Sequence, residues 1–232
     1  MENTNPKHLA MILDGNRRFA KKLMLEPWKG HEFGVKTLEN LLEWAKELGI
    51  TQLTFYCLST ENLKRDKKEL EYLFEIFKKQ FDKLNNQDNQ EKIEKNKLKI
   101  RFIGNLELLS KDLKEKCIKL QEKTSKNNTL TVNFAIAYGG RQELVHAIKN
   151  IIKNKIPEDK ITEETIKQNL YMEDEPDLII RTGGVIRTSN FLPFQSAYSE
   201  WFFLDKLWPE FTKQDLINII EDFKKRKRNF GK

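Results

Sequence analysis

The sequence predicts an α/β fold, a single domain over residues 1–232 in which a central, mostly parallel six-stranded sheet is flanked by helices. Short apolar runs recur along the chain, and segments with helical hydrophobic periodicity separate them, which is the pattern of strand–helix–strand units. We find neither an internal repeat nor a linker rich in Pro, Gly and Ser, and 232 residues suit one domain of this class.

The apolar runs are expected to be buried strands, because a parallel sheet is covered on both faces and its strands are hydrophobic throughout. The expected strands are residues 8–13, 53–58, 98–103, 130–137, 177–180 and 201–204.

Four segments carry apolar residues at helical spacing and are expected to be helices that pack on the sheet. Their stripes are Val35, Leu38, Leu41, Leu42 and Ala45; Leu70, Leu73, Phe74 and Phe77; Leu144, Ala147, Ile148, Ile151 and Ile152; and Leu216, Ile219, Ile220 and Phe223. Gly49 is expected to end the first of these helices. The polar stretch 85–97 is expected to be an exposed helix extension or a mobile loop.

Composition excludes some classes of protein and leaves others open. The net charge of +7 suits nucleic acid, an anionic membrane surface or a polyphosphate substrate. Cys57 and Cys117 are too few for a disulfide framework, and no Walker A or GxGxxG sequence is present. His8, His31 and His146 lack the spacing of a zinc site. With no signal peptide and no long apolar run, we expect a cytoplasmic protein.

Polar and charged residues follow four of the expected strands, where ligands bind in open α/β sheets. These segments are residues 14–18, 59–62, 138–141 and 181–184. Because parallel strands end at the same edge of a sheet, the four segments predict a polar, partly cationic cleft.

The residues in these segments suit a diphosphate and a hard cation. On position alone, Asp14 is more typical of a helix cap than of a metal ligand. Arg17, Arg18, Arg181 and Arg187 change that interpretation, because the planar guanidinium pairs well with diphosphate oxygens. One carboxylate among arginines suits Mg²⁺ that also contacts phosphate oxygens.

Several longer motifs resemble those of the cis-prenyltransferase family, of the undecaprenyl diphosphate synthase type. They are MILDGNRRFAKK with GHEFG, FYCLSTEN with LKR and Glu69, FAIAYGGRQEL, DLIIRTGG with IRTSNFLPFQSAYSEWFF, and LWPEF. They occur in the family order and extend over nearly the whole chain. The resemblance implies condensation of isopentenyl diphosphate with an allylic prenyl diphosphate, a dimer, and a hydrophobic tunnel for the prenyl tail.

The resemblance also implies roles for individual residues. Asp14 and Asn62 would be catalytic, and Asp14 and Glu200 would bind Mg²⁺. The implied substrate-binding residues are Gly15, Asn16, Arg17, Arg18, Phe19, His31, Ser59, Thr60, Glu61, Arg65, Arg181, Arg187 and Ser189. A homodimer is expected, with a heteromer as the alternative, and contact with a membrane surface follows from the lipid product.

Three positions depart from the family pattern. Val185 replaces the acidic residue after RTGG, Pro27 replaces an arginine, with Lys29 nearby, and Asn229-Phe230-Gly231 replaces a C-terminal RxG. These changes leave open a non-catalytic or co-dependent subunit of a heteromeric enzyme, although the intact Asp14 and Asn16 favour an active one. The basic tail, residues 224–228, raises nucleic-acid binding as a third hypothesis, but we expect none because no such motif is present.

Product length has conflicting signals in the sequence. Cys57, Phe134 and Ile136 would face the tunnel if the strands alternate regularly, and their bulk indicates a shorter product. The polar stretch 85–97 points to a longer one, since a longer flanking helix widens the tunnel. Ordinary core packing is the alternative interpretation of Phe134.

Overall fold

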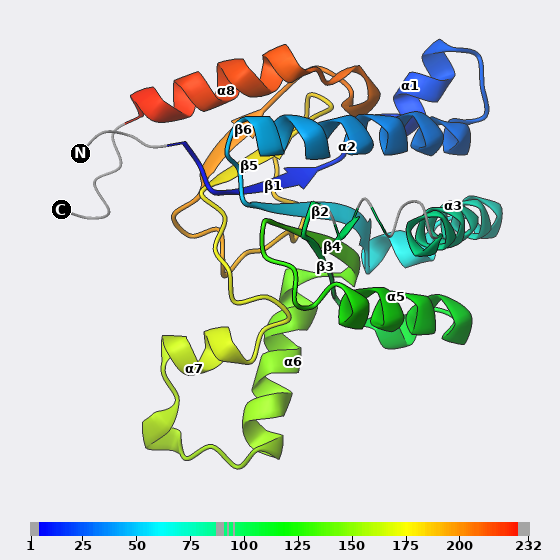
Figure 1. Ribbon diagram of the computed structural model, residues 1–232. Coiled ribbons are helices and arrows are strands. Elements are labelled where there is room, and N and C mark those ends of the chain that lie inside the picture. Colours follow the sequence, from blue (N-terminus) through cyan, green and yellow to red (C-terminus); the bar gives the residue numbers. More distant parts are fainter. Residues whose placement is uncertain (1–4, 87–90, 92, 95, 227–232) are drawn as a thin grey trace.

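The sheet is six-stranded, and each of its neighbouring pairs is parallel. The computed structural model describes residues 5–86, 91, 93, 94 and 96–226. The strand order is β3-β4-β2-β1-β5-β6 (Figure 1). The strands are β1 (His8–Ile12), β2 (Gln52–Ser59), β3 (Leu98–Ile103), β4 (Leu130–Tyr138), β5 (Leu178–Arg181) and β6 (Glu200–Phe203). The six predicted strands are confirmed, with ends that differ by at most one residue.

The four predicted apolar stripes lie on helices α2, α3, α6 and α8. The helices are α1 (Asn16–Lys22), α2 (Gly30–Glu47), α3 (Lys67–Asn85), α5 (Lys111–Lys123), α6 (Gly140–Lys153), α7 (Glu163–Gln168) and α8 (Lys213–Lys225). Gly49 follows the end of α2 with φ at 75°, as predicted. The analysis of periodicity missed α1, α5 and α7, of which α1 and α7 are too short for a stripe to repeat.

Both faces of the sheet are covered, as expected for parallel strands. On one face, Met11 and Phe55 pack with Leu41 of α2 and Leu216 of α8. On the other face, Ala10 packs with residues of the loops that follow α7 and β5, among them Met172, Phe191 and Leu192. Figure 1 shows α2 and α8 on one side of the sheet and α6 and α7 on the other.

The polar stretch 85–97 is only partly described, and it is not uniformly exposed. Ile93 is buried and joins the core formed by α3, α5 and β3. Residues 87–90, 92 and 95 lie outside the described residues. Among the described residues, no helix has the length and hydrophobicity needed to cross a membrane.

Two glycines bring α1 and α2 close to the end of β1, where the polar segments gather. Gly15 has φ at 113° and turns the chain from β1 into α1. Gly30 begins α2 in contact with α1, so that a Cβ there would lie 1.9 Å from the backbone oxygen of Asn16. The position of Asn16 therefore depends on the absence of a side chain at Gly30.

We predict that Gly30→Ala destabilises the protein by about 1–3 kcal/mol, because the added methyl group meets backbone that cannot move aside alone. The free energy of unfolding in urea measures this effect. Asn40→Ala, at an exposed position of the same helix, is the matched control and should change it little. Equal stability of the two variants would contradict the close approach of α1 and α2.

Candidate active site

The polar segments after β1, β2 and β5 come together around one pocket of about 250 Å³. The pairing of Ile12 with Arg181 places the ends of β1 and β5 side by side, so Asp14 stands next to Arg181. Predicted residues that line the pocket are Asp14, Asn16, His31, Ser59, Asn62, Arg65, Arg181 and Ser189. A polar cleft at the carboxyl edge of the sheet is therefore present, formed by three of the four predicted segments; the fourth, residues 138–141, contributes no residue to the lining of this pocket.

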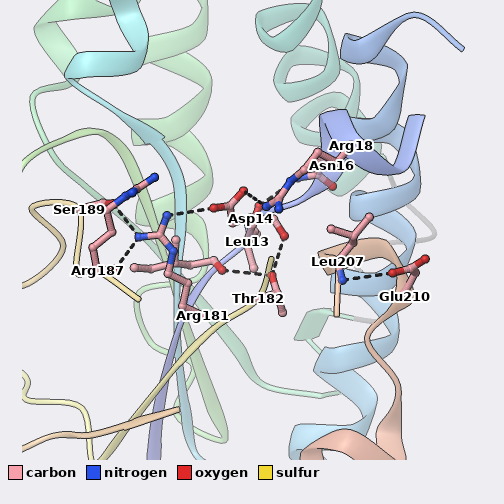
Figure 2. A network of polar contacts seen from close by, with 11 residues as sticks. Leu13, Asp14, Asn16, Arg18, Arg181, Thr182, Arg187, Ser189, Leu207 and Glu210 are labelled. Atoms are coloured by element: carbon pink, nitrogen blue, oxygen red, sulfur yellow. Dashed lines mark hydrogen bonds and ion pairs between the residues drawn. The ribbon is translucent and has the colours of Figure 1, made fainter. Parts of the chain in front are cut away.

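Asp14 lies between two guanidinium groups (Figure 2). Its Oδ1 accepts a hydrogen bond from Arg18 at 3.1 Å, and its Oδ2 accepts one from Arg181 at 2.9 Å. The backbone oxygen of Asp14 accepts bonds from the hydroxyl of Thr182 at 2.8 Å and from the backbone N–H of Trp208 at 3.0 Å. Two other loops thus fix the residue at the strand end.

The alternative interpretation of Asp14 as a helix cap is wrong. Gly15 occupies the cap position of α1, and no side chain caps that helix. The carboxylate points instead to the arginines, where it remains 31% exposed. Both carboxylate oxygens are therefore available at the pocket for a ligand that displaces or joins the arginines.

Arg181 is the buried base of the pocket, with 5% of its surface exposed. Besides Asp14, its guanidinium donates to the backbone oxygen of Arg187 at 2.5 Å and to the hydroxyl of Ser189 at 2.6 Å. Its Nε is buried and lacks a hydrogen-bond partner among the described residues. Arg181 thus ties the end of β5 to the loop that carries Arg187 and Ser189, both of them exposed.

A second cluster of cations surrounds Glu69, which the predicted set of site residues did not include. Glu69 is 5% exposed, and its Oε1 lies 3.0 Å from Arg65, 3.7 Å from Arg17 and 3.9 Å from His31. The His31 side chain, and then Arg65 and Arg17, hold the pKa of this carboxyl below its usual value, against the opposing effect of burial. The charged Glu69 therefore gathers three cationic or cation-forming side chains from separate segments.

These cations form one wall of an adjoining polar pocket of about 450 Å³. It is lined by Leu13, Asp14, Gly15, Asn16, Arg17, Arg18, Lys21, His31 and Arg65. Arg65 directly follows the 3₁₀-helix η2 (Glu61–Lys64), and the remaining lining residues come from the β1–α1 segment and the start of α2. The predicted residues Gly15, Arg17 and Arg18 thus join the same site.

Two of the predicted site residues have a buried polar atom without a protein partner among the described residues. The Oδ1 of Asn16 and the Oγ1 of Thr60 are buried without hydrogen-bond partners among the described residues. Asn16 is held by a bond of 3.1 Å from its Nδ2 to the backbone oxygen of Leu13, and Ser59 accepts a bond of 3.1 Å from the backbone of Asn62. Buried polar groups are nearly always paired, so these atoms fit a bound polar ligand or water.

Two predicted substrate-binding residues have other contacts. Glu61 accepts a hydrogen bond at 3.1 Å from Asn190, which links η2 to the loop after β5. Phe19 packs edge-on against Phe33, with 5.2 Å between ring centres, and is not part of the walls of the pockets described above. Thr60 and Arg187 also contribute to neither of these pockets, and substrate contact by all the predicted residues stays a prediction.

The two predicted metal ligands do not meet within one chain. Asp14 follows the carboxyl end of β1, whereas Glu200 begins β6 and pairs with Leu178 at the opposite end of the sheet. Glu200 instead forms an ion pair of 2.7 Å with Arg226. No group of three or more His, Cys, Asp or Glu side chains with metal-binding geometry occurs among the described residues.

The residues around Asp14 nevertheless suit a Mg²⁺ site that has few protein ligands. Mg²⁺ commonly takes one or two protein carboxylates and completes its shell with water and phosphate oxygens. Asp14 offers one partly exposed carboxylate, and the nearby Oδ1 of Asn16 is a hard oxygen without a partner among the described residues. The surrounding arginines suit the phosphate groups that would share the ion.

An apolar cavity of about 420 Å³ continues from the polar pocket between α2, α3 and the sheet. Both share the wall residues Val35, Leu38, Cys57, Ile76 and Phe77. Phe134 and Ile136 also line the cavity, so these strand residues and Cys57 face the same space, as regular alternation of the strands predicted; that this space is a tunnel for a prenyl tail stays a prediction. Burial raises the pKa of the Cys57 thiol to about 12, so it contributes no charge.

Sequence reasoning missed other residues that shape the site. Trp208 is fully buried, lines the polar pocket and donates from Nε1 to the backbone oxygen of Gly34 at 3.0 Å. Glu69 and Trp208 belong to the motifs quoted in the sequence analysis, so their position in a motif could have selected them, but their chemistry alone could not.

Three positions depart from the family pattern. Of these, Pro27 begins η1 (Pro27–Lys29), Val185 is half-buried, and residues 229–231 lie outside the described residues.

Comparison with known proteins agrees with this geometry. The family model Prenyltransf, described for undecaprenyl diphosphate synthase, matches residues 12–231. A tritrans,polycis-undecaprenyl-diphosphate synthase (geranylgeranyl-diphosphate specific) of Pyrococcus abyssi is 46% identical over 98% of this chain and 87% of its own. An isoprenyl transferase of Thermotoga maritima is 44% identical over 97% of both chains.

A solved structure extends the likeness to three dimensions. Lavandulyl diphosphate synthase from Lavandula x intermedia, in complex with dimethylallyl diphosphate, superposes with a TM-score of 0.88 at 30% identity, over 98% of this chain and 99% of its own. The family match runs from the end of β1 through α8, and the relatives cover nearly the whole chain. The chain therefore belongs to the undecaprenyl diphosphate synthase family of prenyltransferases.

Proposed function

We propose that this protein is a Mg²⁺-dependent cis-prenyltransferase that condenses isopentenyl diphosphate with an allylic prenyl diphosphate to give a polyprenyl diphosphate. One observation carries the proposal: the polar pocket with Asp14 and the arginines adjoins, through shared wall residues, a cavity whose lining is mostly apolar. A prenyl diphosphate has the same division, with an anionic head and an apolar tail. The relatives named for such substrates support the assignment.

The head of the allylic substrate would bind at the end of β1. Asp14 would hold Mg²⁺, whose chemistry there is to neutralise the charge that develops on the departing diphosphate. Gly15, Asn16 and Arg18 would bind the same diphosphate, and the hydrogen bond of Arg18 to Asp14 supports this role. Preorganised cations are most effective where negative charge develops in the transition state.

Isopentenyl diphosphate would bind beside it, on the loop after β5. Arg181, Arg187 and Ser189 are the proposed diphosphate contacts, and their mutual hydrogen bonds hold this loop against the Asp14 carboxylate. Asn62 and Asn16, both of which line the pocket between the two heads, would orient the reacting carbons and assist proton removal.

The tail would occupy the apolar cavity, which lies directly behind the head pocket. Each buried methylene contributes roughly 0.8 kcal/mol, so one added C5 unit contributes roughly 3–4 kcal/mol at most. Growth is therefore favoured while the cavity still covers the new unit. The depth of the cavity, and not the chemistry at Asp14, would determine where growth ends.

We also propose that two copies of the chain associate through α6. Val145, Ile148 and Ile152 lie at helical spacing on this helix and are 51%, 53% and 70% exposed. Apolar side chains that share one exposed helix face are typical of an interface. The family resemblance, which implies a dimer, supports a second copy as the occupant.

We predict that Asp14→Asn lowers kcat by a factor of about 10² or more, because the amide keeps a hydrogen-bond acceptor for Arg181 but loses the charge that would hold Mg²⁺. Steady-state assays with Mg²⁺, isopentenyl diphosphate and farnesyl diphosphate measure the effect. Asp112→Asn, at an exposed position on α5, is the matched control. Equal turnover by both variants would show that Asp14 has no role in the reaction.

We predict that Arg187→Ala raises the KM for isopentenyl diphosphate about tenfold or more, because one charged hydrogen bond to that head is lost. The KM for the allylic substrate should stay close to that of the unmodified protein. Lys119→Ala removes an exposed cation from α5 and serves as the control. An effect confined to the allylic substrate would assign Arg187 to the other head.

We predict that Ile148→Glu, alone or with Ile152→Glu, converts the dimer to a monomer, since a carboxylate would have to be buried without a partner. Light scattering after size-exclusion chromatography gives the mass directly. Lys149→Ala, a substitution at the neighbouring position on α6, is the control, and this variant should still have the mass of a dimer. A wild-type mass of one chain, or a dimer in all variants, argues against this interface.

A further inference from the structure

The turn that follows α1 exposes three consecutive apolar side chains. Leu23, Met24 and Leu25 are 47%, 97% and 36% exposed, so no described residue covers the side chain of Met24. Figure 1 shows this turn at the periphery of the molecule, beyond the start of α2. We call residues 23–25 the apolar tip.

The backbone holds the Met24 side chain away from the fold. The N–H groups of Met24 and Leu25 donate to the carbonyl oxygens of Lys21 and Ala20, at 3.0 and 2.9 Å, and so close the end of α1. In this arrangement Met24 has φ at 57°, in the left-handed region that glycine adopts with least strain. The sequence therefore places an exposed apolar side chain where glycine would adopt the turn more easily.

Positive charge is in excess around the apolar tip. Residues 17–33 contain five Lys or Arg side chains and two carboxylates, all of them exposed. Arg17, Arg18 and Lys22 each contact a carboxylate of the fold, whereas Lys21 and Lys29 form no ion pair among the described residues. An apolar tip with cations on both sides is complementary to a surface that has anionic groups above an apolar layer.

The apolar tip also lies next to the polar site. Arg17, Arg18 and Lys21 line the pocket of about 450 Å³ beside Asp14, and Lys21 is one helical turn before Met24. Because these three cations are themselves exposed, the pocket reaches the surface of the molecule beside the tip.

We propose that the apolar tip docks this protein on an anionic lipid bilayer, with Leu23 and Met24 among the acyl chains and the nearby cations at the headgroups. Burial of one large apolar side chain strengthens binding about tenfold or more. Each cation close to anionic headgroups adds about fivefold. The docking itself is independent of the proposed reaction. Its use rests on that reaction, since a prenyl diphosphate would then enter or leave the polar pocket beside the bilayer.

A bilayer fits the apolar tip better than a second protein does. A stable protein–protein interface buries about 800 Å² on each partner, from roughly 20–30 residues. The tip has three apolar residues in a single turn, and that turn lies at the periphery of the molecule. Fluid acyl chains adapt to the shape of such a small tip, whereas a folded partner would need a matching hollow.

The test measures cosedimentation of the full chain with lipid vesicles, in the absence of substrate. The vesicles consist of phosphatidylcholine alone or of phosphatidylcholine mixed with phosphatidylglycerol. We expect the wild-type protein to bind the mixed vesicles more tightly than the neutral ones. Its affinity for the mixed vesicles should fall as the salt concentration rises, because salt screens the attraction between the cations and the headgroups.

Met24→Gly should weaken binding to the mixed vesicles about tenfold or more, because the inserted side chain is lost. The same change should not lower the free energy of unfolding, because glycine adopts the left-handed conformation without strain. A loss of binding in this variant therefore cannot come from a loss of folding, which urea unfolding monitors. Met24→Leu keeps an apolar side chain and should bind as the wild type does.

Two matched controls lie away from the apolar tip. Ile161 is 44% exposed and precedes α7, which Figure 1 shows far from α1, so Ile161→Ser should leave vesicle binding unchanged. Lys29→Ala should weaken binding to the mixed vesicles about fivefold. Lys225→Ala removes an exposed cation at the end of α8, on the other side of the molecule, and should have no effect.

Four results would overturn or support the docking role. Equal affinity of the wild type and Met24→Gly for the mixed vesicles would overturn it, and so would equal affinity of the wild type for neutral and mixed vesicles. A smaller mass of Met24→Gly in light scattering would assign the tip to a contact between copies of the chain and overturn it as well. None of these results bears on the prenyltransferase assignment. Vesicle binding that depends on Met24, in a protein that makes no product, would support the docking and count against the proposed reaction.

Discussion

The ion pair between Asp14 and Arg181 is the contact on which the rest of the site depends. Arg181 is a nearly buried cation, and a buried charge is tolerated only when it is paired and hydrogen-bonded. Its partner is a carboxylate at the end of β1, and its other bonds reach the loop of Arg187 and Ser189. One guanidinium thus joins two strand ends and the loop at which a second diphosphate would bind.

Around this pair, the fold separates charge from apolar surface. Arg17, Arg65 and His31 gather at Glu69 on the head side, while most residues that line the adjoining cavity are apolar. The helices α2 and α3 contribute to both spaces, because residues one or two turns apart on each helix face the head pocket and the cavity in turn. A substrate with an anionic head and an apolar tail matches this order.

Local pattern was enough to predict the sheet and much of the site. The strands were recognisable because a parallel sheet buries both faces, which leaves continuous apolar runs. The rule that ligands bind at the carboxyl ends of strands selected residues 14–18, 59–62, 138–141 and 181–184, and all but 138–141 contribute to the pocket. The local sequence pattern could not predict which side chains, distant in the chain, contact each other. The buried carboxylate of Glu69 meets Arg17 and His31 through folding, and the helix-cap interpretation of Asp14 failed because Gly15 holds the cap position.

The sequence by itself determined the order of the six strands and of helices α2, α3, α6 and α8, the family motifs and the kinds of group at the strand ends, because these depend on local periodicity and on residue identity. The tertiary structure decided which of those groups meet. It joined Asp14 to Arg181, placed Glu200 at the opposite end of the sheet with Arg226, and positioned Glu39 against Lys83 across the cavity. These contacts link residues far apart in the chain, and only the packing of helices on the sheet brings them within a few ångströms.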